Sequence, residues 1–241
     1  MIQAPTPSSR ALSPLLAIVP AVVLMALVLV DTSAVDFAVE GWFYTAGDGF
    51  IGKHAWVLED FMHDFLKKAV IVFALLALLA WMVSFSRRQW QQWRRPLGYL
   101  VLAMGLSTGI VTHLKDLTGV HCPWDIKEFG GPYTYVHILD HKPEAEPRGR
   151  CWPAGHAATG FSLFALFFFL RDRRPQLARR VLIGVLTFGS LLALGRMIQG
   201  AHFLSHTVAT GLIAWLICLG CYRVLLYRRS SGPVRTAAQE A

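Results

Sequence analysis

Three short groups of polar residues lie between long apolar runs in the middle of this sequence. They are, in chain order, Lys115 with Cys122–Pro123, then Pro153–Ala154–Gly155–His156, then Arg196 with His202 and His206. Lysine and arginine hold the oxygens of a phosphate group, and a histidine can attack phosphorus or protonate a leaving group. Histidine side chains ordinarily titrate near neutrality, so His202 and His156 form a candidate nucleophile and acid. The residue types therefore indicate phosphoryl transfer.

The two cations of these groups lie beside apolar runs. Lys115 and Arg196 both stand where a charge without a partner is costly and is usually functional. Gly155 precedes His156 at the expected start of a helix, so backbone N–H groups can approach an anion closely there. We therefore expect the three groups to meet at one site.

The composition predicts the scaffold that must position this site. The chain has 241 residues, of which 54% are hydrophobic and 16% charged, whereas soluble domains carry roughly 25% charged residues. The apolar runs approach the length of roughly 20 residues that crosses a bilayer. We predict an all-α polytopic membrane protein with six transmembrane helices in one bundle. The spans are expected at residues 11–30, 68–85, 96–114, 157–170, 181–199 and 206–226.

One membrane domain, residues 1–241, is the economical division, with a catalytic core at 68–226 and a polar tail at 228–241. A cleavable signal peptide is the competing interpretation of the first run, which exceeds the roughly 7–15 residues of a signal core. The acidic, aromatic connection at 31–66 fits either an interfacial segment or a loop whose helix packs on the bundle. The sequence leaves these two equal.

The net charge of +8 follows membrane topology. Arginines gather in the links at residues 87–95 and 171–180 and in the tail, on the side of both termini. The positive-inside rule makes that side cytoplasmic, so the three polar groups face the extracytoplasmic, or periplasmic, side of the inner membrane. Arginines at the ends of apolar runs do not form one solvated basic face, so no nucleic-acid partner is expected.

Two of the four cysteines lie in the long outward loop. Cys122 and Cys151 each adjoin a polar group, and an extracytoplasmic compartment permits disulfides. We predict that they are bridged, the alternative being two free thiols. Closing a loop of about 30 residues stabilises a fold by roughly 3–4 kcal/mol on the chain-entropy model.

Taken together, the three groups resemble the type 2 phosphatidic acid phosphatase superfamily, whose pattern is K-x6-R-P, then P-S-G-H, then S-R-x5-H-x3-D. Six residues separate Lys115 from Cys122, five separate Arg196 from His202, and three separate His202 from His206. The resemblance covers residues 68 to 226. It implies a lipid phosphate or diphosphate phosphatase that acts at the extracytoplasmic face through a phosphohistidine.

The resemblance also implies a role for each residue. His202 would be the nucleophile, His156 the general acid and His206 the group that orients the nucleophile. Lys115, Arg196, Gly155 and Ala154 would hold the phosphate, with no cofactor and no metal. Candidate substrates are undecaprenyl diphosphate, phosphatidylglycerol phosphate, phosphatidic acid and lipid A phosphate; the oligomeric state is unknown.

This chain departs from the family pattern at four positions. Cys122 replaces the first arginine, Ala154 and Gly195 replace two serines, and His206 replaces the aspartate. Lys127, Arg148 or Arg150 could replace the arginine, and Asp116, Asp125 or Asp140 could replace the aspartate.

The departures keep other functions open. A lipid phosphotransferase of the same fold and an inactive phospholipid-binding relative are the alternatives. His202 and His206 also stand one helical turn apart and could chelate zinc with Cys122, Cys151 or His121. A small transporter fits less well, because the cations gather at one end of the spans.

Overall fold

The computed structural model describes residues 11–53, 55–58 and 65–227. The leader before residue 11, the acidic residues Glu59, Asp60 and Asp64, and the predicted tail at 228–241 lie outside the described residues.

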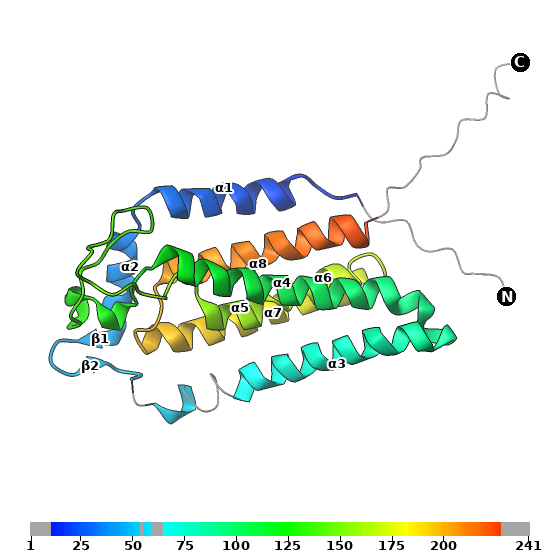
Figure 1. Cartoon of the computed structure of the whole chain (residues 1–241), viewed down its shortest axis with the longest axis horizontal. Coiled ribbons are helices and arrows are strands. Elements are labelled where there is room, and N and C mark those ends of the chain that lie inside the picture. The colour runs from blue at the N-terminus through cyan, green and yellow to red at the C-terminus, as the bar shows by residue number, and fades with distance from the viewer. Residues whose placement is uncertain (1–10, 54, 59–64, 228–241) are drawn as a thin grey trace, which may run out of the picture.

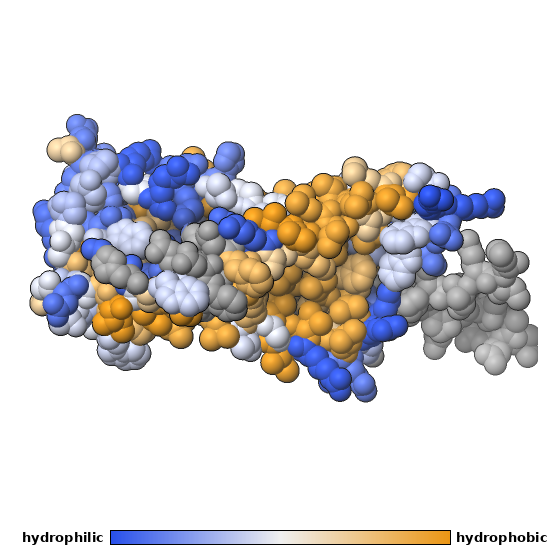
Figure 2. All heavy atoms as spheres, turned by 90° about the horizontal axis from the view of Figure 1, so that it is seen from below, coloured by the Kyte–Doolittle hydropathy of each residue, from blue (hydrophilic) through white to orange (hydrophobic). Residues whose placement is uncertain are grey.

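Long helices running side by side form the body of the molecule (Figure 1). They are α1 (Leu15–Leu29), α3 (Leu66–Ser86), α4 (Arg94–Thr118), α7 (Pro175–Ile198) and α8 (Leu204–Leu225), together with the shorter α5 (Gly155–Phe161) and α6 (Phe164–Leu170). The space-filling view shows a broad apolar band between two hydrophilic ends (Figure 2). Such a band is what a bundle presents to lipid hydrocarbon.

The predicted number of six spans is not confirmed. In the described part of the chain, α3, α4, α7 and α8 are each long and apolar enough to cross a membrane. Helix α1 meets these criteria only together with the segment after it, from which it is bent by 89°, which makes five spans if the bent pair counts as one. The predicted span at 157–170 is an apolar helix of fewer than 18 residues, Gly155–Leu170.

Local features explain why the fourth run is divided into α5 and α6. The Ser162 hydroxyl donates a hydrogen bond of 2.7 Å to the carbonyl of Thr159, and such side-chain bonding to the preceding turn bends helices. Close packing explains why a short helix is nonetheless stable here. A Cβ on Gly160 would lie 2.9 Å from Gly189 Cα of α7, so the absence of side chains brings the two backbones together.

The helices α4, α5, α6, α7 and α8 share one apolar core. Its fully buried side chains include Tyr99 of α4, Phe168 of α6 and Tyr222 of α8. Helix α3 lies at the edge of the bundle (Figure 1), with large apolar side chains such as Leu76 exposed. On its inner side, Val70 and Ala77 of α3 join the buried core.

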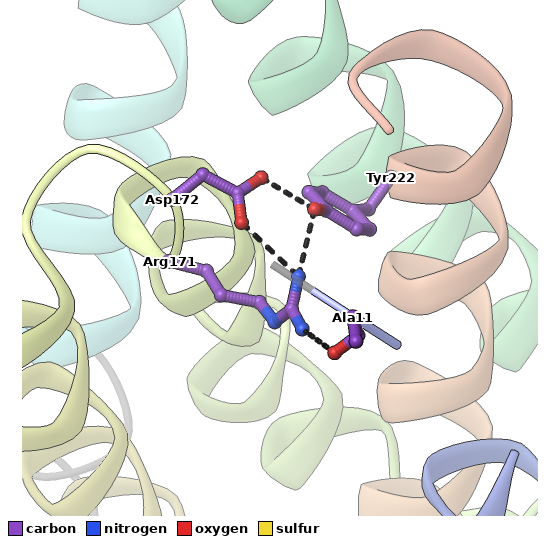
Figure 3. A network of polar contacts seen from close by, with 4 residues as sticks. All are labelled: Ala11, Arg171, Asp172 and Tyr222. Atoms are coloured by element: carbon purple, nitrogen blue, oxygen red, sulfur yellow. Dashed lines mark hydrogen bonds and ion pairs between the residues drawn. The ribbon is translucent and has the colours of Figure 1, made fainter. Parts of the chain in front are cut away.

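The end of the bundle that carries the arginine-rich links is held together by polar contacts (Figure 3). Arg171, after α6, donates to Asp172 at 3.1 Å, to the Tyr222 hydroxyl at 2.9 Å and to the carbonyl of Ala11 at 2.8 Å. The Tyr222 hydroxyl in turn donates to Asp172. The short 3-10 helix η3 (Arg88–Trp93) joins α3 to α4 at this end.

The opposite end is covered by α2 (Ser33–Glu40), η1 (Gly41–Phe43), the hairpin of β1 (Tyr44–Thr45) and β2 (Gly49–Phe50), and a long loop with η4 (Pro123–Asp125) and η5 (Lys127–Phe129) (Figure 1). In the hairpin, Tyr44 pairs with Phe50 and Thr45 with Gly49. A buried cluster of Phe50, Ile126, Phe129 and Phe203 joins these segments to the start of α8.

Helix α2 packs on the bundle, as expected for this part of the chain in one of the two interpretations of residues 31–66. Asp36 accepts hydrogen bonds from the backbone N–H of Ser205 at 2.9 Å and from its hydroxyl at 2.5 Å. These bonds satisfy a free N–H in the first turn of α8, where a negative charge is favoured. Asp36 therefore anchors α2 to the first turn of α8.

Candidate active site

The last turn of α4 presents the first polar group. Lys115 is half-buried there, and the helix ends at Gly119 in the left-handed conformation, with φ 62°. The amine of Lys115 lies 3.1 Å from the position that a Cβ on Gly155 would take. Glycine at position 155 therefore leaves room for a cation directly over the start of α5.

Hydrogen bonds to residues 118–120 at the end of α4 and to His206 of α8 hold the second polar group in place. The Thr118 hydroxyl donates to the carbonyl of Trp152 at 2.7 Å, and the backbone N–H of Cys151 donates to Val120 at 2.9 Å. The backbone N–H of Ala154 is 3.4 Å from the carbonyl of His206. Ala154 caps α5 and is fully buried, so Gly155 and His156 become the first two residues of that helix.

The third polar group is carried by the tight turn between α7 and α8. Gly200 has φ 75°, a conformation that residues with a side chain rarely adopt. Its carbonyl accepts from the N–H of Trp124 at 2.9 Å, and the N–H of Ala201 donates to the carbonyl of Arg196 at 2.8 Å. The turn places His202 inward, where its exposed fraction is 3%.

The structure brings together the three histidines of the second and third polar groups. The ring centroids of His156 and His202 are 6.4 Å apart, and those of His202 and His206 are 6.2 Å apart. Burial, followed by the nearby charge of Lys115, lowers the pKa of His202 well below its ordinary value. His202 is therefore a neutral imidazole at neutral pH, the form in which a ring nitrogen is nucleophilic.

Cys122 and Cys151 form the predicted disulfide, with their Cα atoms 5.1 Å apart. Cys151 is fully buried, and its sulfur lies 3.2 Å from Nδ1 of His202. The disulfide therefore ties the loop after α4 to the loop before α5 directly beside the candidate nucleophile.

His206 does not hydrogen-bond to His202. Its Nδ1 is buried and has no hydrogen-bond partner in the described part of the chain. The contact that the family pattern assigns to this position is thus not seen here, because the ring of His206 packs against Phe203, edge to face at 5.2 Å between centroids.

Arg196 is half-buried in the last turn of α7. It donates to the side-chain oxygen of Gln199 at 2.6 Å, and its guanidinium carbon stands 5.4 Å from the ring centre of Trp124. Gln199 was not expected from sequence reasoning, although its place three residues after the arginine, on the same helix face, could have indicated the contact.

A groove of about 570 Å³ leads from this site along the membrane-facing side of the bundle. Its polar end is formed by Lys67, Lys115, Arg150, Gly155 and His156. Its remaining walls are mainly apolar side chains of α3 and α4, among them Val70, Leu78, Val101 and Met104. His202 and Arg196 do not line the groove, and His202 is buried beside His156.

Arg150 is the loop cation that the fold brings to the groove. It pairs with Asp116 at 2.8 Å, and both side chains are at least half exposed. Arg148 instead donates to the carbonyl of Leu117, and Lys127 donates to the hydroxyl of Thr134. Of the three loop cations considered as replacements for the arginine of the first motif, Arg150 alone lines the groove.

None of the three loop aspartates contacts His202 within the residues that the structure describes. Asp116 pairs with Arg150 and Asp125 accepts from the backbone of Cys122. The groups that act electrostatically on His202 are Lys115, His206, His156 and Arg196. The permanently charged groups among these, Lys115 and Arg196, are both positive.

The acidic residues of α2 lie near the site and were not singled out from the sequence. Asp36 accepts a hydrogen bond from the backbone N–H of Ser205, the residue before His206 in the first turn of α8. Glu40 is fully buried, and neither of its carboxylate oxygens has a hydrogen-bond partner in the described chain. Their spacing of four residues within an otherwise apolar stretch would place both on one helix face, which is the signal that could have found them.

The possible metal ligands Cys122, Cys151 and His202 have ligand atoms within 4.8 Å of one another. Metal binding requires thiolates, and the two sulfurs are bonded to each other. The residues present therefore fit a disulfide beside a histidine better than a zinc site.

Known proteins share both the sequence pattern and the fold. The sequence model of the PAP2 superfamily matches residues 96–230. Lipid A 4'-phosphatase of Francisella tularensis subsp. novicida (strain U112) is 26% identical over 198 residues, covering 80% of this chain and 87% of that protein. The crystal structure of a transmembrane PAP2 type phosphatidylglycerolphosphate phosphatase from Bacillus subtilis superposes with a TM-score of 0.55 at 13% identity, covering 87% of this chain and 96% of that one.

Proposed function

Since the chain belongs to the PAP2 superfamily, a family of lipid phosphatases, we propose that it hydrolyses a phosphate ester or diphosphate of a membrane lipid. The lateral groove carries this proposal. Cations and His156 form one end of the groove, and apolar side chains of α3 and α4 form the rest. That combination fits a molecule with a phosphate at one end and a hydrocarbon chain at the other.

The length of the groove supports a lipid over a soluble phosphate ester. Its lining on α4 runs from Lys115 to Val101, and fourteen helical residues rise by about 21 Å. Ile71 and Leu75, on the α3 side, are exposed at 45% and 58%. A hydrocarbon chain lying between α3 and α4 would therefore stay in contact with the surrounding acyl chains.

In the proposed reaction, Nε2 of His202 attacks phosphorus and His156 protonates the lipid oxygen that leaves. Both rings must reach one phosphoryl group, with the nucleophile about 3 Å from phosphorus and the acid about 3 Å from the leaving oxygen. The ring centroids of His156 and His202 lie 6.4 Å apart, so the two side chains stand close together at the site. Water then attacks the phosphohistidine, losing a proton to His156, and releases inorganic phosphate.

The cations supply charge to the equatorial oxygens of the phosphate. Lys115 and Arg150 line the polar end of the groove, and the charge of Arg196 acts on His202. Preorganised donors of this kind, aimed at charge that develops in the transition state, are usually the largest contribution to such a rate. Gly155 and Ala154 add no side chain, so a phosphate can come close to the backbone at the start of α5.

We further propose that lipid A phosphate is the first substrate to test, because the 26% identical relative is a lipid A 4'-phosphatase. Phosphatidylglycerol phosphate, undecaprenyl diphosphate and phosphatidic acid complete the panel. The arginine-rich links lie at the end of the bundle opposite the groove's polar end. By the positive-inside rule, the site is extracytoplasmic, in the inner membrane, with both termini cytoplasmic.

The experiment is phosphate release by the detergent-purified protein from each lipid, beside His202→Ala and in the presence and absence of a chelator. We expect release from at least one lipid, which disappears in His202→Ala and survives the chelator. A folded protein that releases phosphate from none of them, or His202→Ala with unchanged activity, would contradict the proposal. Transfer of labelled phosphate to a second lipid, without release, would identify a phosphotransferase instead.

A further inference from the structure

The sulfur of Cys151 and Nδ1 of His202 are in hydrogen-bonding contact at 3.2 Å, although 51 residues separate them in the chain. A disulfide sulfur carries no hydrogen, so in this contact it can only accept. The proton must then reside on Nδ1 of the imidazole, which leaves the lone pair on Nε2. Both residues are buried, with exposed fractions of 0% and 3%, which limits competition from water.

We propose that the Cys122–Cys151 disulfide positions the nucleophile, by accepting the Nδ1–H of His202 and so directing Nε2 at phosphorus. The inference rests on the proposed phosphatase function. It gives Cys151 the part that the family pattern gives to an aspartate four residues after the histidine. His206, which occupies that place here, has no partner at Nδ1 in the described part of the chain.

The sulfur is held rigidly against the turn that carries His202. The backbone N–H of Cys151 donates to Val120 at 2.9 Å, and the disulfide fixes Sγ to the loop after α4. The same sulfur lies 2.8 Å from the carbonyl oxygen of Ala201, the residue before His202. Its position relative to the imidazole is therefore set from three directions, which is what orientation of a tautomer requires.

The charged surroundings make this acceptor necessary. The titratable groups that face His202 are Lys115 from α4, His156 from α5, Arg196 from α7 and His206 from α8. None of these four offers a carboxylate, so the sulfur is the group that can select the tautomer. The wrong tautomer in a histidine-dependent enzyme can cost a factor on the order of 10⁴ in rate.

The lone pair of Nε2 forms a bond to phosphorus while the bond from phosphorus to the lipid oxygen breaks, and that oxygen takes its proton from His156. Nδ1 keeps its proton and its contact with Cys151 throughout. Water next attacks phosphorus, gives a proton to His156 and restores the lone pair on Nε2.

A matched pair of double variants separates positioning from simple crosslinking. Cys122→Ala/Cys151→Ser and Cys122→Ser/Cys151→Ala have the same composition, and both lack the disulfide. Only the first retains an acceptor at position 151 beside Nδ1. We expect its kcat to exceed that of the second by about tenfold, the effect of one hydrogen bond in the transition state, with KM equal within about twofold.

Equal kcat values in the two variants would overturn the inference and leave the disulfide as a crosslink only. Loss of wild-type activity to a chelator would also overturn it, because Cys122, Cys151 and His202 would then hold a metal. An inactive wild-type protein refutes the proposed function itself, and this inference with it. An active wild type with an indistinguishable pair refutes the positioning alone.

A second measurement uses the wild-type protein and does not depend on the variants folding. The phosphoenzyme is trapped during turnover and hydrolysed in alkali, and the two phosphohistidine isomers are separated. Phosphate on Nε2 of His202 is expected, because Nδ1 carries the proton that the sulfur accepts. Phosphate on Nδ1 would overturn the inference.

Discussion

Arg150→Ala tests whether the fold has replaced the arginine missing at Cys122 with a cation from another part of the loop. Arg150 pairs with Asp116 at 2.8 Å, but the two side chains are 67% and 50% exposed. Exposed pairs of this kind contribute at most about 1 kcal/mol to stability. We therefore expect the variant to fold with a thermal unfolding midpoint close to that of the wild type.

The effect on activity should be much larger than the effect on stability. Arg150 lines the polar end of the groove with Lys115 and His156, where a phosphate would be desolvated. One hydrogen bond to a charged group contributes roughly 1.5–3 kcal/mol, so its loss lowers kcat/KM by roughly 10- to 150-fold. Arg150→Lys should fall between the two, because it keeps the charge and loses the planar pair of donors.

The assay is initial-rate phosphate release from the best lipid substrate across a range of substrate concentrations. Arg148→Ala and Lys127→Ala are matched controls, because these cations lie in the same loop but do not line the groove. Both should keep kcat/KM within about threefold of wild type, the scale set by a change of under 1 kcal/mol. A loss in Arg148→Ala as large as that in Arg150→Ala would refute this assignment and indicate a general effect of loop charge.

Three further results are expected. Gly200→Ala should lower the free energy of unfolding by about 1–3 kcal/mol in detergent, because φ is 75° and the added Cβ would collide with Phe50. Tyr222→Phe should cost about 1 kcal/mol through lost bonds to Arg171 and Asp172, leaving kcat unchanged. Burial lowers the pKa of His202, so the acidic limb of kcat/KM should lie below about pH 6.5.

Each result has a control or a contrary outcome. Gly220→Ala adds a Cβ with nothing within 4 Å inside α8, where alanine is favoured over glycine by roughly 0.5–1 kcal/mol, so the free energy of unfolding should stay the same or rise; equal losses at both glycines would contradict the strain argument. A drop in kcat for Tyr222→Phe would mean that the far end of the bundle is coupled to the site. In the unfolded chain the imidazole of His202 takes up a proton near pH 6.5, whereas in the folded protein its pKa is lower. The free energy of unfolding should therefore fall as pH drops below about 6.5. A free energy of unfolding that rises there would contradict the lowered pKa.

The sequence was sufficient to predict the helical membrane bundle and the family. Apolar runs and arginine-rich links follow bilayer thickness and charge asymmetry, which act on composition over many residues. The disulfide between Cys122 and Cys151 was also predictable, because two cysteines in one outward loop have few other partners. The meeting of the three polar groups at one end followed from the alternation of spans.

The number and continuity of the spans could not be obtained in this way. Hydropathy does not register the 89° bend after α1 or the division of the fourth run at Ser162, which depend on local hydrogen bonds. Nor does it indicate that Asp36 reaches the first turn of α8. The contact of Asp36 with Ser205 joins residues far apart in the chain and arises from packing.

The details of the site were the least accessible to sequence reasoning. The family resemblance implied that His206 orients the nucleophile, but a matching motif position does not say which way a ring turns. The contact between Cys151 and His202 joins two different polar groups, and it exists only once the turn at Gly200 has formed.

The lateral groove determines which measure of substrate concentration governs binding to this protein. A molecule that enters between α3 and α4 arrives from the plane of the bilayer, so the quantity that governs occupancy is its mole fraction among the surrounding lipids. Adding inert detergent at constant total substrate dilutes that surface and slows turnover, whereas adding buffer at a constant ratio of substrate to detergent does not. In a cell, the protein would then respond to the local lipid composition of its own leaflet, independently of how much membrane the cell contains.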